Sequence, residues 1–520
     1  MKLKIKLINL LIPLFSFVLC LGVVSCKKQE KNIQPPENIR VENDTLLWNA
    51  VSHAEWYLLD IDGSEYETDE PYFDLFVVFI AEKTYQIKIK SVGDETFNYR
   101  KSEWSPVYEY VLHSTPLYCR IINDNEYEIK PANPTELSGT IVLPSAINGL
   151  PVTTISPSAF KGATKLTSII IPDSVLEIGN SAFSDCTNLQ RIRMPKNLKK
   201  ISNLTFYNCL SLQEIRLPVC DEIQNAAFSN CQSLKSLRIP QQVKEIGHNI
   251  IENCNALTSL IVEDGNRFYR SEGNCIIEKK SDRLITGCSA SEIPSGIKTI
   301  AAFSFVGVMF EDFSLPSTIE TIEYFAFVEC SSPSFYLPEN VIDFYGASYS
   351  HGVNLTKLSV HPSNPVFKSE NNCIIRKSDN TLILGCQTSV IPQYVTAIGD
   401  EAFEGSELKE IEIPVSVKQI GESAFKFCGS LKELRFSSGL LKIAPAAFKA
   451  CKSLEKVYFP DGLLEIGAQA FQGCSNLAYV RLPYGLQSIG ARAFYATSLS
   501  YKTVEIPKTV TFLGSEAFSC

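Results

Sequence analysis

The sequence predicts a protein that is mostly β, in which an N-terminal β-sandwich precedes a right-handed solenoid with short helical turns. Three observations support this fold class. A large side chain, nearly always phenylalanine, recurs every 22 or 23 residues through most of the chain after residue 150. Apolar residues two positions apart precede a recurrent proline, as expected of short strands that the proline ends. All three tryptophans precede residue 110, so the composition changes where the repeat begins.

Length and composition place the 520-residue chain among ordered proteins, because 45% of its residues are hydrophobic and only 20% are charged. That length allows several domains or one long array. The formal net charge of −9 argues against a nucleic-acid-binding surface, which is normally basic. The 17 cysteines are many for a chain of this size and need an explanation position by position.

The N-terminus has the pattern of an export signal. Lysines at positions 2, 4 and 6 precede an apolar run over residues 7–24, which is the order of a secretory signal peptide. The run is also long enough for an uncleaved membrane anchor, which is the alternative. It ends in the tetrapeptide Val23-Val24-Ser25-Cys26, which resembles a bacterial lipobox.

The lipobox resemblance implies where the protein resides. Residues 1–25 would be removed, and the thiol of Cys26 would carry a diacylglycerol. Two or more acyl chains anchor a protein stably to a membrane. The polar residues 26–34 then form a tether. The implied location is that of a bacterial outer-membrane lipoprotein exposed at the cell surface.

Residues 35–113 are predicted to form the small β domain. Apolar residues alternate with period two in three segments, which are Leu46/Trp48, Tyr57/Leu59/Ile61 and Tyr85/Ile87/Ile89. Residues 84–89 and 102–105 resemble the F and G strands of fibronectin type III domains, with Tyr85 in the place of the tyrosine-corner residue. The resemblance implies a β-sandwich that serves as a spacer or a binding module.

Residues 118–520 repeat one frame. The large side chain that marks each unit stands at Phe160, Phe183, Phe206, Phe228, Ile251, Phe305, Phe327, Tyr349, Phe403, Phe425, Phe448, Phe471, Phe494 and Phe518. In the unit around Phe183, Gly179 is expected to permit a backbone geometry that other residues resist. One coil cannot bury its own apolar face, so neighbouring coils must stack.

The frame I-P-x-x-V-x-x-I-G-x-x-A-F-x-x-C, seen in residues 171–186, resembles that of the BspA-like bacterial leucine-rich repeats. The resemblance implies a solenoid of roughly 14–16 coils, with residues 118–150 as its N-terminal cap. Two long units, at about residues 262–293 and 360–391, match each other in sequence. Each is expected to form a β-hairpin that projects from the solenoid and contributes an extra coil to it.

Most cysteines follow the repeat. Eight stand three residues after the large side chain, at Cys186, Cys209, Cys231, Cys254, Cys330, Cys428, Cys451 and Cys474. A buried, reduced ladder is the favoured reading, with disulfides between adjacent coils as the alternative. Their wide spacing does not suit a zinc site. Two hairpin disulfides are predicted, one between Cys275 and Cys288 and one between Cys373 and Cys386.

The sequence predicts no catalytic residue, metal site or cofactor. It contains no H-E-x-x-H, G-x-S-x-G, Walker A or G-x-G-x-x-G motif. The five histidines are scattered without partners at metal-ligand spacing. We therefore expect a protein that is not an enzyme.

A candidate binding surface follows from the strand pattern, because residues that flank the inward-facing ones point to solvent and align across coils. Its predicted members are Arg191, Arg193, Arg216, Arg238, Tyr336, Tyr458 and Arg481. Stacked arginines repel one another, so either Glu214 and its neighbours neutralise them or an anionic partner does. An ordinary solvated face is the alternative reading.

These observations lead to one functional hypothesis with two rivals. The BspA resemblance implies a non-enzymatic, lipid-anchored surface adhesin that binds host or bacterial proteins. The rivals are a glycan-binding accessory lipoprotein of a nutrient-uptake system and a structural envelope protein. The expected partners are the membrane, through the lipid, and a protein or glycan ligand, with no nucleic acid.

Overall fold

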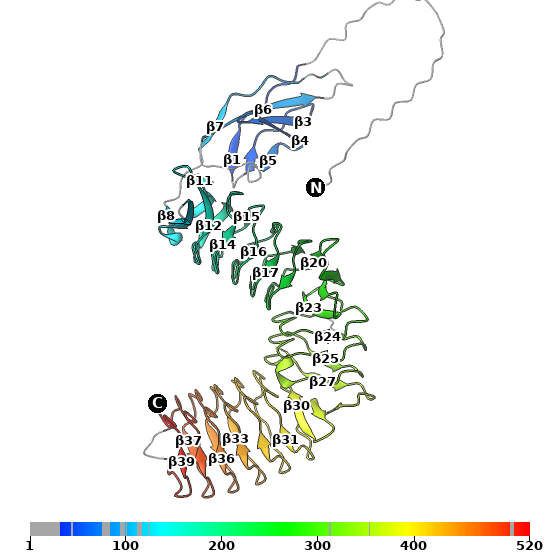
Figure 1. Cartoon of the computed structure of the whole chain (residues 1–520). Coiled ribbons are helices and arrows are strands. Elements are labelled where there is room, and N and C mark those ends of the chain that lie inside the picture. Colours follow the sequence, from blue (N-terminus) through cyan, green and yellow to red (C-terminus); the bar gives the residue numbers. More distant parts are fainter. Residues whose placement is uncertain are drawn as a thin grey trace, which may run out of the picture. The chain divides into compact units, whose positions relative to one another are not determined.

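Two compact units make up the protein, and the chain passes from one to the other between Tyr110 and Val111. The computed structural model (Figure 1) describes residues 32–42, 45–74, 84–93, 99, 101–111, 117–123, 125–310, 314–352, 354–499 and 504–519. The predicted signal peptide and the predicted lipid attachment site, Cys26, lie outside the described residues. As predicted, the fold is mostly β, with small N-terminal sheets followed by a β-solenoid of about sixteen turns.

The N-terminal unit contains two antiparallel sheets. One has the strand order β1-β2-β5, with β1 at Arg40–Glu42, β2 at Thr45–Leu47 and β5 at Tyr72–Asp74. The other has the order β4-β3-β6-β7, with β3 at Ala54–Ile61, β4 at Ser64–Thr68, β6 at Thr84–Gly93 and β7 at Tyr108–Val111. The ring of Trp48 meets that of Tyr57 edge-on at 5.2 Å, and Leu59, Ile87 and Ile89 are fully buried. The alternation predicted for these strands is therefore confirmed.

A five-stranded sheet begins the solenoid unit. Its members are β8 (Leu117–Ile122), β9 (Glu126–Pro131), β11 (Ala146–Ile147), β12 (Leu150–Ile155) and β14 (Glu177–Ile178). Strand β8 runs antiparallel to β9, whereas β12 runs parallel to both β9 and β14. Strand β12 is thus the point at which the antiparallel start of the unit changes to the parallel stacking of the coils.

Most coils contribute a strand of up to six residues to one side of the solenoid, which we call the long-strand side. These strands are β10 (Ser138–Val142), β13 (Lys165–Ile170), β15 (Arg191–Arg193), β18 (Ser236–Ile239), β20 (Ser259–Val262), β26 (Ser334–Leu337), β27 (Lys357–Val360), β33 (Glu433–Arg435), β35 (Lys456–Tyr458) and β37 (Tyr479–Arg481). Neighbours pair in parallel, as in Ile169 with Ile192 and Leu434 with Val457. The inward residues of these pairs are buried.

Two-residue strands form a second parallel ladder. Besides β14, they are β16 (Lys200–Ile201), β17 (Glu222–Ile223), β19 (Glu245–Ile246), β24 (Thr299–Ile300), β25 (Thr321–Ile322), β31 (Ala397–Ile398), β32 (Gln419–Ile420), β34 (Lys442–Ile443), β36 (Glu465–Ile466), β38 (Ser488–Ile489) and β39 (Phe512–Leu513). Two short 3-10 helices, η3 (Pro134–Glu136) and η4 (Gly346–Tyr349), are the helices among the described residues. Within that part of the chain, no helix combines the length and apolar character needed to cross a membrane.

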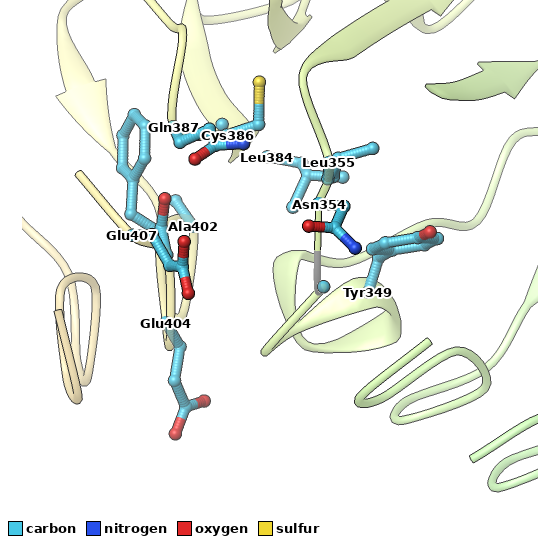
Figure 2. Close-up of a pocket in the computed structure, with 13 residues that line it drawn as sticks. Tyr349, Asn354, Leu355, Leu384, Cys386, Gln387, Ala402, Glu404 and Glu407 are labelled. Carbon is cyan, nitrogen blue, oxygen red and sulfur yellow. The ribbon is translucent and has the colours of Figure 1, made fainter. Parts of the chain in front are cut away.

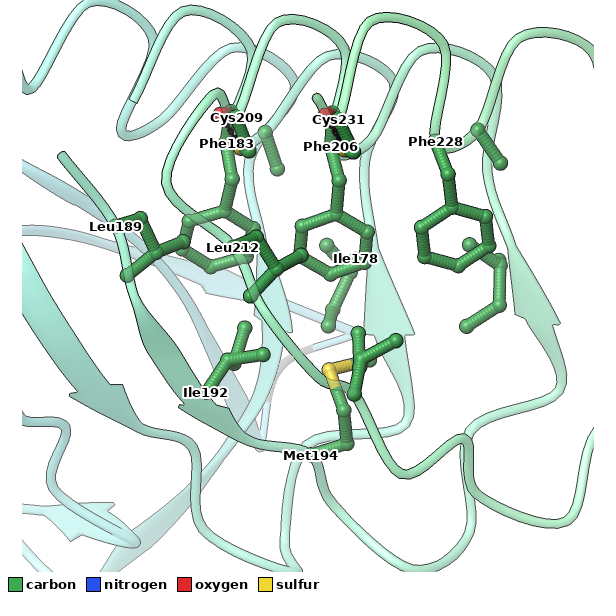
Figure 3. Close-up of a cluster of buried hydrophobic side chains, with 14 of the residues drawn as sticks. Ile178, Phe183, Leu189, Ile192, Met194, Phe206, Cys209, Leu212, Phe228 and Cys231 are labelled. Carbon is green, nitrogen blue, oxygen red and sulfur yellow. Dashed lines mark hydrogen bonds between the residues drawn. The ribbon is translucent and has the colours of Figure 1, made fainter. Parts of the chain in front are cut away.

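Phenylalanine rings stack along the solenoid axis between the two ladders. Phe183, Phe206 and Phe228 lie in a row in Figure 3, with successive ring centroids 5.6 and 5.4 Å apart. A second row runs from Phe403 to Phe518, with neighbouring centroids 4.9 to 5.3 Å apart. This stacking joins adjacent coils and confirms the predicted inward position of the large side chain.

The glycine of the frame has a different role from the predicted one. Gly179 does not adopt a positive φ. A Cβ atom at this position would lie 2.4 Å from the backbone nitrogen of Pro157 in the preceding coil. A Cβ atom at Gly467 would likewise lie 2.5 Å from the backbone nitrogen of Pro445. Glycine is therefore required by the close approach of two backbones, and the predicted reason was wrong.

The two long units form the predicted hairpins, but these are built into the solenoid. The first contains β21 (Tyr269–Glu272), β22 (Cys275–Glu278) and β23 (Arg283–Gly287), and the second contains β28 (Phe367–Glu370), β29 (Cys373–Arg376) and β30 (Thr381–Gly385). In β22 and β29 the first three residues are buried, so both faces are covered. Strands β23 and β30 pair in parallel with β24 and β31. The hairpins thus continue the stack, as Figure 1 shows beside the labels β23 and β30.

On the side of the solenoid that carries the phenylalanine turns, backbone hydrogen bonds connect the coil before each long unit directly to the coil after it. The amide of Asn253 donates to the carbonyl of Val306 at 3.5 Å, and that of His351 donates to the carbonyl of Glu404 at 2.9 Å. The inserted residues therefore lie on the strand side, while the turns continue from coil to coil. The apolar core is divided at the same places into three clusters, which span residues 127–288, 275–386 and 373–517.

Candidate binding surface

The outward-facing column on the long-strand side, which we call the strand column, has the register that the sequence predicted wherever regular strands form. Tyr336 pairs with Ser359, and Tyr458 pairs with both Arg435 and Arg481. Arg193 pairs with Ile170, which is buried although its position in the column was predicted to face solvent. Buried residues alternate with these positions, since Leu434, Val457 and Val480 face inward. A parallel ladder with period two therefore brings residues about 23 apart in sequence onto one face.

The N-terminal arginines of the strand column fall into two pairs. Arg191 and Arg193 are half-buried and have interaction partners. Arg193 lies close to Asp173: burial raises the pKa of this carboxyl, but hydrogen bonds from Lys196 and the charges of Lys196 and Arg193 outweigh burial and lower it overall. The structure thus neutralises this part of the column, though with Asp173 rather than the predicted Glu214.

Arg216 and Arg238 remain available to bind a ligand. Both side chains are exposed, and neither forms a hydrogen bond or ion pair with any residue that the structure describes. Residues 213–217 form no regular strand, but the amide of Lys235 donates to the carbonyl of Gln213 at 3.1 Å. This bond keeps the coils of Arg216 and Arg238 adjacent, so two like charges remain side by side.

At the C-terminal coils the column becomes aromatic. The guanidinium of Arg435 lies over the ring of Tyr458 at 4.1 Å, and its Nε donates to a carboxylate oxygen of Glu433 at 2.6 Å. The ring of Tyr479 lies 6.2 Å from that of Tyr458. Arg481 is exposed, and three quarters of Tyr484 is exposed. Tyrosine and arginine are concentrated here on one solvent-facing surface.

Tyr336 stands apart from both groups. It is exposed and makes an edge-on contact with the His361 ring at 6.5 Å. The Nε2 atom of His361 lies 3.7 Å from a Glu339 carboxylate oxygen. The predicted column therefore consists of an N-terminal arginine group, Tyr336 alone, and a C-terminal group in which tyrosine and arginine lie together.

The predicted hairpin disulfides are not formed, because all four cysteines are free and buried. Cys275 pairs in register with Gly287, so the side chain of the next residue, Cys288, points to the opposite face. Cys275 packs in the core cluster of Leu284, whereas Cys288 packs in the cluster that precedes it. Cys373 and Cys386 are divided between two clusters in the same way.

The eight repeat cysteines are free thiols, and each makes the same kind of hydrogen bond to the coil before it. Each Sγ donates to the carbonyl of the large residue in the preceding coil, as in Cys209 to Phe183 at 3.2 Å and Cys474 to Phe448 at 3.1 Å. Burial raises the pKa of the Cys186 and Cys254 thiols to about 12. Because the thiolate is the reactive form, these cysteines are structural. Within the described ranges, no group of three or more His, Cys, Asp or Glu side chains is arranged to hold a metal ion.

A small pocket lies beside the second hairpin (Figure 2), with Tyr349 and Asn354 on one side and Cys386 and Glu404 on the other. Its volume is about 20 Å³, which is room for about one water molecule. The carboxylate of Glu404 is engaged by Lys426 at 2.8 Å and lies 3.4 Å from Nε2 of His351. The pocket is too small for an organic ligand, so the surface is the better candidate site.

Comparison with known families assigns the repeat. The family described as the BspA-type leucine-rich repeat region matches residues 153–272, 285–395 and 396–520. The chain belongs to the BspA-type leucine-rich repeat family. Proteins with BspA-type repeats are generally surface proteins without enzymatic activity. A search among curated proteins finds no match for this chain.

Several solved structures of bacterial proteins are similar to this chain. A leucine-rich cell surface protein from Faecalibacterium prausnitzii is 22% identical, with 78% of this chain and 94% of that chain covered and a TM-score of 0.39. A leucine-rich repeat protein from Bacteroides ovatus is 23% identical, with 78% and 100% covered and a TM-score of 0.36. The pneumococcal vaccine antigen PcpA is 17% identical, with 76% and 91% covered and a TM-score of 0.30. These similarities carry no argument about the ligand.

Sequence reasoning missed three members of the strand column on this BspA-type solenoid. Glu433 and Tyr479 occupy the second outward position of their strands, in register with Lys456. Tyr484 follows Pro483, shortly after the strand of Tyr479. The signal for Glu433 and Tyr479 was present, because each strand has two outward positions on either side of its buried residue, and apart from Arg191 the predicted column followed only one of them.

Proposed function

We propose that this BspA-type protein is a lipid-anchored, cell-surface adhesin that binds a protein ligand through the strand column. The surface role is inferred from the family, and lipid attachment is inferred from the lipobox-like residues that end at Cys26. The ligand is a host or bacterial surface protein that carries anionic groups, because unpaired arginines attract them. No chemical step is required of this surface.

The observation that carries the proposal is the exposed, unpaired state of Arg216 and Arg238 on adjacent coils. Like charges held next to each other destabilise a fold, so their presence on adjacent coils is better explained by binding than by stability. Arginine and tyrosine are also the residue types enriched in binding hot spots. Tyr458, Tyr479 and Arg481 extend this chemistry to the C-terminal coils.

We also propose that the N-terminal unit is a fibronectin type III-like spacer between the lipid and the solenoid. Its three-stranded and four-stranded sheets support this reading. Two serines join residues 102–105 to β6, because Ser91 and Ile89 donate their amides to Ser102 and Ser105 hydroxyls at 2.9 and 3.0 Å. A stiff module at this position would hold the solenoid away from the membrane surface.

A glycan-binding accessory lipoprotein is the second candidate function. Exposed aromatic rings are typical of surfaces that bind sugars, and Tyr479 and Tyr484 are 49% and 75% exposed. This candidate requires the tyrosines of the strand column to dominate binding, whereas the adhesin requires the arginines. A structural envelope protein requires neither.

The proposal is tested by screening the full-length protein, purified in detergent, against matrix proteins, bacterial cells and glycans. We expect binding to a protein ligand that falls at least tenfold when Arg216→Glu is combined with Arg238→Glu, since reversal of two hot-spot charges removes two favourable pairs. The matched control combines Lys199→Glu with Lys452→Glu, two exposed lysines outside the strand column. Equal losses in both variants would remove the column from the proposal, and binding to no candidate would leave the structural role.

Lipid attachment is tested by metabolic labelling with a fatty-acid analogue. We expect the label to be lost in Cys26→Ser and retained in Cys119→Ser, because Cys119 is the exposed free thiol among the described cysteines. Labelling that survives Cys26→Ser would reject the lipobox reading.

A further inference from the structure

A row of aromatic side chains lies on the phenylalanine-turn side of the solenoid, from the coil before the first hairpin to the coil before the second. The ring of His248 lies 5.5 Å from that of Phe303, and Phe303 stacks on Phe325 at 5.4 Å. Tyr324 lies 6.2 Å from Phe325 and stacks on Tyr345 at 4.3 Å. We call these five residues the aromatic edge. It shares no residue with the strand column.

The aromatic edge is not part of the core. Tyr324 is 49% exposed and Tyr345 is 41% exposed, although each buries one ring face against the other. Phe303 and Phe325 are half-buried beside them, and exposed aromatic residues that adjoin one another in this way are characteristic of an interaction surface. The stacked pair leaves its outer faces open to solvent.

Backbone strain supports the same conclusion. Phe303 and Phe325 adopt φ values of 63° and 60°, in the left-handed region that bulky residues rarely occupy. The same position in other coils is held mostly by small or polar residues, such as Ser158, Ser181, Ala226, Asn249, Ser423 and Ala446. A strained phenylalanine in a place that the fold fills more easily with serine indicates that the ring serves another purpose.

Carboxylates continue the aromatic edge on the next coils. Asp400 and Glu401 follow Tyr345 across the stack, since a Cβ atom at Gly346 would lie 2.7 Å from the carbonyl oxygen of Asp400. Their charges reach Tyr324, because burial, Tyr345, Glu401 and Asp400 together raise the pKa of this tyrosine. Burial, together with the neighbouring charges of Glu404, Asp400 and Glu422, raises the pKa of Glu401 to about 7, despite an opposing effect from Lys426. Negative charge therefore accumulates here.

The nearby cations already have partners. Lys426 binds Glu404 at 2.8 Å, and Arg283 binds Glu323 at 2.6 Å. The carboxylates of Asp400 and Glu401 form no ion pair with the residues that the structure describes, although Oδ1 of Asp400 accepts a backbone hydrogen bond from Glu422 at 2.7 Å. An arriving cation would thus find charge that the protein itself does not neutralise.

We propose that the aromatic edge, with Asp400 and Glu401, binds an arginine-containing segment of a partner protein. A guanidinium stacks on aromatic faces and also forms forked hydrogen bonds to a carboxylate, and here both groups lie on adjacent coils. A lysine ammonium satisfies the charge but not the stacking. The surface differs from the strand column in both its residues and its charge preference.

The test measures fluorescence anisotropy of labelled decapeptides with the full-length protein in detergent. The probes alternate serine with arginine, lysine or glutamate. We expect the arginine peptide to bind several-fold more tightly than the lysine peptide, and the glutamate peptide not to bind. Absence of arginine-peptide binding, or equal affinity for the lysine peptide, would overturn the proposal.

Two variants and two controls locate the site. Tyr324→Leu with Tyr345→Leu removes the rings but keeps apolar side chains, and Asp400→Asn with Glu401→Gln removes the charges. We expect each pair to weaken arginine-peptide binding about tenfold. The controls are Tyr118→Leu with Tyr207→Leu, and Glu455→Gln with Asp461→Asn, which make the same changes at exposed positions outside both the aromatic edge and the strand column. If the controls lose as much affinity as the variants, the binding is general attraction to an acidic protein and the proposal fails, whereas the adhesin proposal is unaffected.

Discussion

Individual positions in this repeat are each explained by one contact with the preceding coil. The thiol of Cys209 donates to the carbonyl of Phe183, and Gly179 lies against the backbone of Pro157. The ring of Phe425 stacks on Phe403 at 4.9 Å and on Phe448 at 5.0 Å. Each residue thus stabilises the join between two coils more than its own coil, which is the energetic character of a repeat protein.

The first residue-scale prediction concerns the phenylalanine stack. Phe425→Ala removes a fully buried ring and should lower the free energy of unfolding by roughly 3–5 kcal/mol. The matched control is Phe427→Ala, two residues away, where the ring is 45% exposed and the loss should be below about 1 kcal/mol. Chemical denaturation followed by circular dichroism measures both. Similar losses at the two positions would show that the stack contributes little.

Thiol reactivity provides the second prediction. Burial raises the pKa of the Cys186 and Cys254 thiols to about 12, so almost no thiolate exists at these positions at pH 8. N-ethylmaleimide should therefore modify Cys119, which is exposed, but not the buried cysteines of the described chain until the protein is denatured. Peptide mass spectrometry after brief and long exposure reads out each site. Rapid native labelling of Cys209 or Cys451 would contradict the buried ladder.

A third prediction follows from Glu401, whose pKa is raised to about 7 by burial and neighbouring carboxylates. Because the folded protein holds this proton more tightly than the unfolded chain does, folding stability should decrease as pH rises from about 4.5 to 7. Glu401→Gln removes this contribution, so the variant should unfold at a higher temperature than the original protein at pH 8 but not at pH 4.5. Thermal unfolding at both pH values tests this, and an equal shift at both would contradict it.

At the scale of the element, each of the two hairpins is joined to the preceding coil by one buried asparagine. Asn266 and Asn364 are almost fully buried. The side-chain amide of Asn266 donates to the carbonyls of Pro240 and Val243 at 3.1 and 3.0 Å, and its oxygen accepts from the amides of Phe268 and Tyr269 at 2.8 Å. Asn364 makes the equivalent four bonds. Each asparagine thereby ties the start of a hairpin to the coil before it.

The prediction at this scale is that Asn266→Ala destabilises the first hairpin strongly. The change leaves buried carbonyl and amide groups without partners, and each such group costs about 1–3 kcal/mol. We expect a total loss above about 2 kcal/mol. Asn340→Ala is the control, because Asn340 is exposed and donates one bond, to Ser317 at 2.8 Å. A loss no larger than that of the control would show that water replaces the four bonds.

The whole solenoid has a continuous backbone ladder but a divided core. Turn hydrogen bonds cross both long units, whereas the buried side chains form three clusters that meet at β22 and β29. Because stability in repeat arrays is a sum of local terms, the clusters should respond to mutation separately. Hydrogen exchange on Phe425→Ala should accelerate mainly over residues 373–517 and little over residues 127–262. Uniform acceleration would indicate one cooperative unit.

The sequence predicted the repeat frame, the inward phenylalanine and the register of the strand column, because each depends on spacing along the chain. It did not predict the free cysteines of the hairpins. Residues 13 apart look close in sequence, but only the pairing of Cys275 with Gly287 shows that Cys288 faces another core. It also missed Asn266 and Asn364, since an asparagine in a loop is common and its burial is not visible in the pattern.

By itself, then, the sequence determined which residues face inward, since the period of the repeat fixes the face of each side chain, and it determined the family through that frame. The tertiary structure decided which outward residues come together. The aromatic edge joins His248, Phe303 and Tyr345, which are separated by the first long unit and by irregular turns. Stacking of the coils brings such residues within contact distance. The sequence spacing does not show this, because the turns before and after an inserted hairpin are far apart along the chain but adjacent in the folded solenoid.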